Sequence, residues 1–430
     1  MEEAPPSLSL NRWTSVPVLA IAWISFASGV GQFGVVAALG DVAKSFGHIA
    51  SGATIANQAG LSGSSLGLGL AIIRLASLGA LPLAAIADRL GRRIVLLAIT
   101  TVGLTITLIA AASPGYWWFV VIFATGRPML SAANSLCSVL AAEETSSKDR
   151  AKAMAAVAAA YGVGAGVTAI IHSLAGSTLG FRGICLLAAV PLATLPFAAR
   201  KLKEPVRFIG VAQARAKRQS AGKQKTSVIL AAMRPPYRSR MLIVALLAFF
   251  LSVVTGPANT FVFLYAQNIL HVAGTVTALM VVCAGATGLL GLFAGRWSAD
   301  HFGRRKTASF MMMLLAVTQV VTYSGSKTGM FAGYVIGVGI AATFAPAAGA
   351  LANELFPTEV RASVGGWNVA AGVLGAAVGL LVFGLIADIG NRFGVAAAVT
   401  FLPSVLIALV FFALPETNGK EPEEIWPATP

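Results

Sequence analysis

Residues 80–110 read ALPLAAIADRLGRRIVLLAITTVGLTITLIA, two long apolar runs joined by a short charged turn. The turn runs from Asp88 to Arg93 and holds one acid and three bases. A hydrocarbon core of about 30 Å is crossed by roughly 20 apolar residues in a helix. Because backbone groups in lipid must be satisfied within each helix, the pattern predicts two membrane helices joined by a polar turn.

The same alternation continues along the whole chain, which is 57% hydrophobic and only 11% charged. An ordinary soluble domain has about 25% charged residues, so the composition excludes that class. The first apolar stretch is too long for the core of a signal peptide and is interpreted as a retained helix. We predict an all-α membrane protein with twelve transmembrane helices, at residues 15–40, 59–86, 94–112, 117–141, 153–174, 182–199, 241–265, 274–297, 307–325, 329–352, 364–387 and 393–413.

The net charge of +15 comes from basic residues that gather in alternate loops, twelve of them within residues 200–240. The positive-inside rule therefore places both termini and this central segment in the cytoplasm. The basic residues are read as an insertion signal with anionic lipid headgroups as contacts, and not as a nucleic-acid surface. The compact loops suggest the inner membrane of a bacterium.

The two sets of six predicted helices repeat each other. The segment from Asp88 to Arg93 matches the segment from Asp300 to Arg305, an offset of 300 − 88 = 212. Glu143 after the fourth helix matches Glu354 after the tenth, an offset of 354 − 143 = 211. Duplicated halves are typical of secondary transporters. We predict an N-terminal half at 1–199, a basic linker at 200–240, a C-terminal half at 241–414 and a tail at 415–430.

At these residues the chain resembles the major facilitator superfamily, whose loop after the second helix carries Gly-x-x-x-Asp-Arg-x-Gly-Arg-Arg. Two more stretches, at 354–362 and 415–425, resemble the sugar and metabolite porter branch. The resemblance implies pseudo-symmetric halves that alternate access, and a charge network that latches the cytoplasmic side. The gating residues that it implies are Asp88, Arg92, Arg93, Glu143, Arg150, Asp300, Arg304, Arg305, Glu354 and Arg361. The alternative reading of these charges is that they only orient the helices.

Two arginines are predicted near the middle of membrane helices, Arg74 in the second and Arg127 in the fourth. A charge at that depth is costly and needs a water-filled cavity or a partner, and no acid is predicted nearby. An anionic substrate would supply that partner. The alternatives are that Arg127 bonds backbone carbonyls near Pro128, and that Arg74 extends its charge to the membrane interface.

Further polar residues in predicted helices are weaker candidates, because such residues often only join helices. The full set of expected substrate-binding residues is Arg127, Arg74, Gln32, Asn134, Tyr161, Asn259, Tyr265, Gln319 and Asn368. Ser131 shares a helix face with Arg127 and Asn134. His172, near the outer end of the fifth helix, is a candidate for a proton pathway, and its alternative is simple solvation.

These features favour a transporter of a small polar metabolite, an organic anion, sugar or polyol, without cofactor or metal. Two alternatives stay open, an exporter of amphipathic drugs or lipids that exchanges them for protons, and a transporter-like receptor. An enzyme is not expected, since no catalytic set can be placed at one membrane depth. The first helix lacks the membrane aspartate that many proton-coupled relatives carry and reads Gly29-Val-Gly-Gln32-Phe-Gly34 instead, so the role of protons is left open. We expect a monomer in the lipid bilayer.

Overall fold

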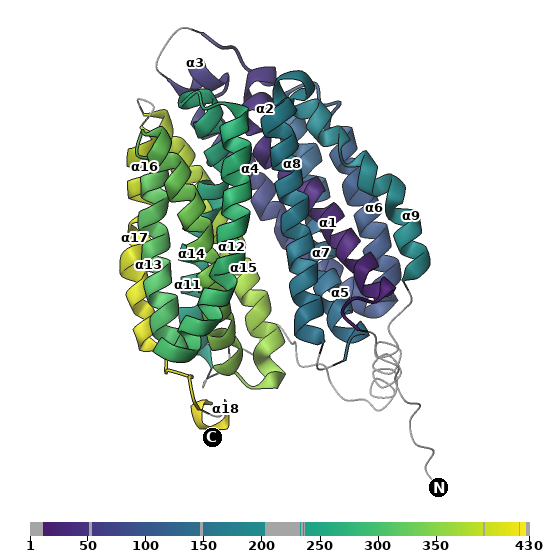
Figure 1. The fold of residues 1–430 in the computed structure, drawn as a ribbon, viewed down its shortest axis with the longest axis vertical. Coiled ribbons are helices and arrows are strands. Elements are labelled where there is room, and N and C mark those ends of the chain that lie inside the picture. Colours follow the sequence, from purple (N-terminus) through teal and green to yellow (C-terminus); the bar gives the residue numbers. More distant parts are fainter. Residues whose placement is uncertain are drawn as a thin grey trace.

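The computed structural model describes residues 12–50, 54–146, 149–202, 233, 235, 237–389, 392–420 and 422–426. Every regular element in these ranges is a helix, and Figure 1 shows most of them running side by side along the long axis. Most of the predicted linker at 200–240 lies outside the described residues. The side chain of Asp88 is also outside the described part.

The first helices of the chain form what we call the N-terminal set. Its members are α1 (Val16–Ala37), α2 (Leu39–Phe46), α3 (Ile55–Ala59), α4 (Gly63–Ala76), the 3-10 turn η1 (Ser77–Gly79), α5 (Ala80–Leu90), α6 (Arg92–Ala110), α7 (Tyr116–Glu144), α8 (Arg150–Leu186) and α9 (Ala189–Lys201). Within α8, Gly180 has a φ of 56°, which divides it into two helices and agrees with the separate spans predicted at 153–174 and 182–199.

The remaining helices form the C-terminal set. Its members are α11 (Arg238–Leu264), the π-helical turn η3 (Tyr265–Ile269), α12 (Gly274–Phe302), α13 (Arg304–Thr322), α14 (Lys327–Glu354), α15 (Thr358–Asp388), α16 (Phe393–Phe401), α17 (Pro403–Ile407) and η4 (Ala408–Ala413). A last short helix, α18 (Pro422–Ile425), lies below this set in Figure 1.

Several helices extend beyond the predicted spans at the end that carries the charged motifs, which we call the charged end. The turn between α5 and α6 is reduced to Gly91, with φ of 110°, and the turn between α12 and α13 to Gly303, with φ of 93°. Only glycine adopts such angles without strain. The apolar length of a sequence marks only the part of a helix that lies in lipid. For this reason the motif arginines were predicted in loops, whereas they begin α6 and α13.

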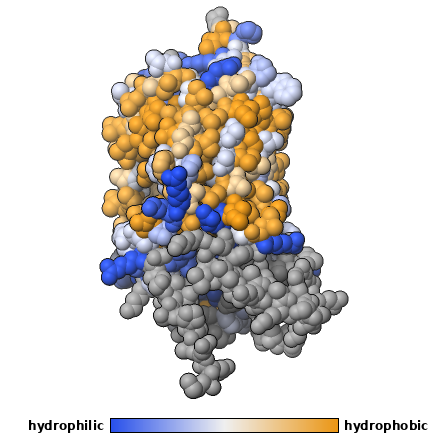
Figure 2. All heavy atoms as spheres, turned by 90° about the vertical axis from the view of Figure 1, so that its right-hand side faces the viewer, coloured by the Kyte–Doolittle hydropathy of each residue, from blue (hydrophilic) through white to orange (hydrophobic). Residues whose placement is uncertain are grey.

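The surface suits a lipid environment. Figure 2 shows a broad band of hydrophobic residues with hydrophilic residues toward both ends. Within the described residues, ten segments are long and apolar enough to cross a membrane. The predicted spans at 117–141 and 307–325 correspond to α7 and α13, which are not among these ten. Both helices are more polar, α7 because of its Arg127 and hydroxyl side chains and α13 because it begins with three basic residues.

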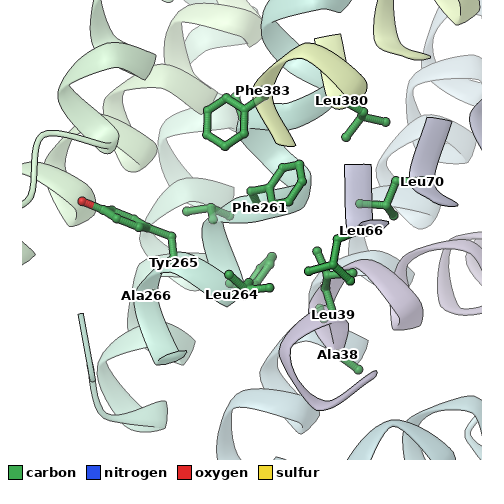
Figure 3. Packing of buried hydrophobic residues seen from close by; sticks show 14 of the residues in the cluster. Ala38, Leu39, Leu66, Leu70, Phe261, Leu264, Tyr265, Ala266, Leu380 and Phe383 are labelled. Atoms are coloured by element: carbon green, nitrogen blue, oxygen red, sulfur yellow. The ribbon is translucent and has the colours of Figure 1, made fainter. Parts of the chain in front are cut away.

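The buried core differs between the two ends of the molecule. At the end opposite the charged motifs, which we call the far end, one apolar cluster includes residues of both sets. Figure 3 shows Leu66 and Leu70 of α4 close to Leu380 of α15, with Phe261 and Phe383 to the left of them in this view. At the charged end each set has its own cluster instead. The two sets are therefore packed together at the far end.

Glycines allow α4 and α15 to approach closely there. A side chain at Gly67 would collide with the carbonyl of Leu380, and one at Gly384 with the carbonyl of Gly63. Small residues of this kind let helix backbones approach in a membrane protein. The far end is closed by direct backbone packing between the two sets.

Candidate functional site

The charged end contains two ion pairs at equivalent positions of the repeat. Arg92 at the start of α6 pairs with Glu143 at the end of α7, and Arg304 at the start of α13 pairs with Glu354 at the end of α14. The four side chains are between 15% and 25% exposed, so the pairs are only partly screened by water. Each pair joins two neighbouring helices within one set.

The neighbouring arginines are placed alike in the two sets. Arg93 donates to the carbonyl of Ala199 at 3.1 Å, and Arg305 donates to the carbonyl of Leu414 at 2.8 Å. Ala199 lies near the end of α9, and Leu414 directly follows η4. The bonds tie α6 to α9 and α13 to the end of η4, so they hold a set together and do not join the two sets.

The other predicted gating residues have different surroundings. Arg361 donates from Nε to the carbonyl of Phe356 at 2.9 Å. The backbone carbonyl of Asp300 accepts from the side-chain amide of Asn418 at 3.0 Å. Arg150 begins α8, and its buried Nε has no partner in the described part of the chain.

One acid of the tail has a role that the sequence did not reveal. The carboxylate of Glu416 accepts from the backbone amide of Arg304 at 3.0 Å and from that of Arg305 at 3.3 Å. Orphan amides and the partial positive charge of a helix start favour an anion there. Glu416 therefore caps α13. The stretch at 415–425 was noticed only as a resemblance, without an assigned contact.

In the interior of the N-terminal set, the predicted candidates on α1 and α7 come together. Arg127 donates from a terminal guanidinium nitrogen to the carbonyl of Gln32 at 3.2 Å, and Ser131 donates to the side-chain oxygen of Gln32 at 3.2 Å. The amide nitrogen of Gln32 donates in turn to Ser28 at 2.8 Å. Arg127 is 9% exposed, and its Nε has no partner in the described part. Its charge is thus buried without a bonded carboxylate.

Two more candidates lie beside this group. Arg127 is close enough to Arg74 of α4 and to Tyr161 of α8 to interact with both electrostatically. Arg74 is half-buried and makes no hydrogen bond or ion pair to another residue of the described part. Two guanidinium groups that repel each other at this depth need an anion or water between them. The structure thus brings together Gln32, Arg74, Arg127 and Tyr161.

The remaining candidate of the N-terminal set is Asn134, whose side-chain oxygen accepts from Ser25 of α1 at 2.9 Å. Ser25 and Ser28 were not predicted, because a serine in an apolar helix carries no distinctive pattern. They show that α1 faces α7 with a row of hydroxyl groups.

The C-terminal candidates do not form a comparable group. The amide of Asn259 donates to the carbonyl of Thr255 in its own helix at 2.9 Å. Tyr265 is 2% exposed, and its hydroxyl accepts from the backbone amide of Gly325 at 2.8 Å. Gln319 is 3% exposed and lies where α13 packs on Gly337 of α14.

Asn368 has the most open surroundings of the C-terminal candidates. It lines an otherwise apolar cavity of about 260 Å³ between α11, α14, α15 and η4. Its side-chain oxygen is buried and has no partner in the described part. This atom is able to accept a hydrogen bond from a ligand that enters the cavity.

At the far end, another unpredicted acid joins the two sets. The carboxylate of Asp388, the last residue of α15, accepts from the backbone amides of Gly63 at 2.5 Å and of Ser64 at 2.7 Å. These amides begin α4, so the charge lies at a helix N-terminus across the contact between the sets. Rocking the sets apart at this end must break both bonds.

Comparison with known proteins agrees with this architecture. A family model described as Major Facilitator Superfamily matches residues 21–298. The chain belongs to the Major Facilitator Superfamily. A second model, described as Sugar (and other) transporter, matches residues 200–428 and places this superfamily member in the sugar porter branch. The predicted family is confirmed.

Solved structures of superfamily members have the same fold. A D-xylose-proton symporter is 19% identical with a TM-score of 0.68, over 94% of this chain and 98% of that chain. The nucleoside transporter NupG is 16% identical with a TM-score of 0.71, over 92% of this chain and 99% of that chain. At these identities the likeness concerns the fold alone.

Similar curated proteins have names that refer to metabolite transport or to multidrug resistance. A Haemophilus influenzae protein named for metabolite transport is 26% identical over 80% of this chain and 84% of its own length. Multidrug resistance protein 1 of Bacillus subtilis is 30% identical over 36% of this chain and 41% of its own length. The chain thus spans less than half of that relative, and 37% of another Haemophilus influenzae protein named for metabolite transport.

Proposed function

We propose that this superfamily member is a secondary transporter of a small anionic metabolite, held between Arg127 and Arg74. The observation that carries the proposal is a pair of neighbouring arginines in the interior, neither of them bonded to a carboxylate in the described part. An uncompensated charge near the bilayer centre costs from about 3 to more than 10 kcal/mol, so a substrate carboxylate or phosphate is a fitting partner. Tyr161 and Gln32 add neutral polar contacts.

In this proposal the two sets are pseudo-symmetric halves at 1–199 and 241–414, each with six membrane helices, joined by the linker at 200–240. Both termini and the tail at 415–430 face the cytoplasm of a bacterial inner membrane, and the protein acts as a monomer. The charged end is then cytoplasmic and the far end extracellular. The shared core and the Asp388 bonds support a state that is closed to the outside.

Asn259, Tyr265, Gln319 and Asn368 remain the candidates from the C-terminal half. Of these, Asn368 is best suited to contact a ligand, because its unpartnered oxygen lies at an apolar cavity. The substrate then carries its charge toward α4 and α7 and its neutral part toward α15. A sugar or polyol would use the same neutral contacts without the arginines.

A second candidate function is export of amphipathic drugs, which the relative from Bacillus subtilis favours. A hydrophobic cation would be repelled by Arg127 and Arg74 and would have to occupy the apolar cavity beside Asn368 instead. The two functions therefore place the ligand on opposite sides of the interior.

The test is ligand-induced thermal stabilisation of the purified full-length protein against organic anions, sugars and hydrophobic cations. Binding to the native state raises stability by mass action. We expect one class of organic anion to raise Tm in the native protein and in Arg296→Gln, an exposed arginine on α12 that serves as the charge-matched control. The shift should vanish in Arg127→Ala. A response to sugars or cations that survives Arg127→Ala would overturn the proposed site.

A further inference from the structure

The far end holds a buried pair of titratable side chains that the proposed substrate site does not use. Nε2 of His172 on α8 lies 2.7 Å from a carboxylate oxygen of Asp41 on α2. His172 is 2% exposed, so it is not solvated, the alternative considered from the sequence. Asp41 is 22% exposed at its side chain, which leaves it a contact with solvent.

The geometry leaves one proton position open. An ionised Asp41 can only accept, so Nε2 of His172 carries the hydrogen of their bond. Nδ1 then keeps its lone pair, and this atom is buried with no partner in the described part. A proton that binds Nδ1 converts the neutral ring to an imidazolium, which then carries a hydrogen on both ring nitrogens.

The pair lies directly behind the contact between the two sets. Gly40, the residue before Asp41, touches the side chain of Asn268 from η3. Ser173, the residue after His172, presents its carbonyl to Gly274 at the start of α12. Movement of the C-terminal set therefore changes the surroundings of both members of the pair at once.

Other unpartnered polar atoms accompany Nδ1 at this contact. The hydroxyl oxygen of Ser173 and the amide nitrogen of Asn268 are both buried without a partner in the described residues. Buried polar groups are normally hydrogen-bonded, so several unpartnered groups at one contact require an explanation, and we attribute them to a contact that opens in another state. Water that enters when the far end opens would supply them.

Other charged or titratable groups near this end are engaged or exposed. Lys44 on α2 and His271 after η3 are exposed. The hydroxyl of Tyr116 on α7 donates to the carbonyl of Ser65, and Arg182 on α8 donates to the carbonyls of Ala111 and Ser113.

Of the elements packed against α8, α1 carries no charged residue. The remaining charged or titratable residues of the neighbouring helices lie in the middle or at the charged end: Arg92 and Arg93 on α6, Arg127, Cys137, Glu143 and Glu144 on α7, and Cys283, Arg296, Asp300 and His301 on α12.

We propose that Asp41 and His172 form a proton-binding site whose occupancy is linked to opening of the far end. In the closed state Nδ1–H would be buried without an acceptor, whereas in the open state water accepts from it. Proton binding thus favours opening, and closing favours proton release. The inference rests on the proposed transport function, because a coupling ion has a role only if the protein transports. It makes the proton that ion and assigns its binding to Asp41 and His172, which lie outside α1.

The test needs no substrate. Spin labels on Ala112→Cys and Lys327→Cys, exposed far-end positions of the two sets, report the distance between them by pulsed electron resonance. Both changes are made in a protein that also carries Cys283→Ser, because Cys283 is partly exposed and would take up the label. Cys137 and Cys185 are buried and can stay. The reconstituted full-length protein is measured between about pH 5 and pH 8, the range in which histidine titrates. One linked proton changes the ratio of open to closed populations by at most about tenfold per pH unit.

We expect the long-distance population to grow as the pH falls, and His172→Gln and Asp41→Asn to remove this dependence. His48→Gln is the matched control, an exposed histidine at the same end, and should behave like the native protein. A pH dependence that persists in either pair variant, or none in the native protein, overturns the proposal. If His172→Gln does not fold, Asp41→Asn decides alone, since it keeps the imidazole. Anion stabilisation through Arg127, measured at one pH, is unaffected by either outcome, so the two proposals can fail separately.

Discussion

The N-terminal and C-terminal sets carry equivalent ion pairs at the charged end but differ in the chemistry of their interiors. By the offset of 212 between the charged motifs, the position in the C-terminal set that is equivalent to Arg74 of α4 is Ala286 of α12. By the offset of 211 between the glutamates, the position equivalent to Arg127 of α7 is Val338 of α14. At the charged end, in contrast, the pairs Arg92–Glu143 and Arg304–Glu354 are equivalent.

This difference separates two regions of the molecule. The two sets are alike where each holds its own helices together, and they differ where the proposed substrate site lies. The N-terminal interior offers charge, and the C-terminal interior offers an apolar cavity with one amide. An asymmetric ligand with one charged end is complementary to such an interior.

Removal of the Arg127 charge should have the largest effect, because it removes the main difference between the two interiors. Hydrogen bonds to a charged group contribute about 1.5–3 kcal/mol, so Arg127→Ala should weaken binding of the preferred anion by roughly 10- to 150-fold. Arg127→Lys keeps the charge but loses the planar guanidinium group, so its affinity for the anion should lie between those of the native protein and Arg127→Ala. Titration calorimetry with the stabilising anion measures both.

The matched control for this prediction is Val338→Ala, a change at the equivalent position of the other set. It should leave anion affinity within about twofold of the native value. An equal loss in Val338→Ala and Arg127→Ala would mean that the loss in Arg127→Ala does not come from its charge, and the proposed asymmetry would be wrong.

The next largest effect tests the part of the comparison that is symmetric. Glu143→Gln and Glu354→Gln each leave a partly buried arginine without its carboxylate. Because these side chains are 15–25% exposed, we expect a loss of about 1–3 kcal/mol in each, between the values for surface and buried pairs. Thermal unfolding in detergent measures the loss. If only one of the two variants is destabilised, the two pairs are not equivalent.

A smaller effect concerns the cap that Glu416 provides for α13. Loss of a helix cap costs about 0.5–2 kcal/mol, and Glu416→Ala should increase hydrogen exchange in the first turn of α13. The first turn of α6 in the same molecule is the internal control and should not change. Glu424→Ala, an exposed acid of α18, controls for the loss of a tail charge. Unchanged exchange at Arg304 and Arg305 would contradict the capping role.

The smallest expected effect sharpens the role of the C-terminal cavity. A neutral hydrogen bond contributes about 0.5–1.5 kcal/mol, so Asn368→Leu should weaken anion binding by roughly 2- to 12-fold while stability stays nearly constant. Stability is preserved because the side-chain oxygen has no partner to lose in the described part. Affinity that is unchanged in this variant would remove Asn368 from the substrate site.

Much of the fold could be predicted from local sequence, because membrane helices are marked by apolar length alone. The helix positions agree with the predicted spans, and their ends were misjudged where helices continue out of the lipid, as at Arg92 and Arg304. Arg74 and Arg127 could also be found, since a charge in an apolar run is conspicuous. Their proximity could not, because it depends on how α4 and α7 pack.

The contacts that sequence reasoning missed join residues far apart in the chain. Asp388 bonds amides 325 and 324 residues away, and His172 meets Asp41 across 131 residues. Each acid looks like an ordinary residue at a helix end when the sequence is read locally. Only the packing of the helices shows which helix start or ring nitrogen lies opposite.

The cap on α13 has a consequence for the order in which the protein is made. Glu416 follows Arg304 by 416 − 304 = 112 residues, so α13 is synthesised long before its cap. At about 5–20 residues per second, this delay is roughly 6 to 20 seconds. During that time the first amides of α13 must bond water or lipid headgroups. The C-terminal set therefore reaches its final hydrogen bonding only after the segment that carries Glu416 has been synthesised.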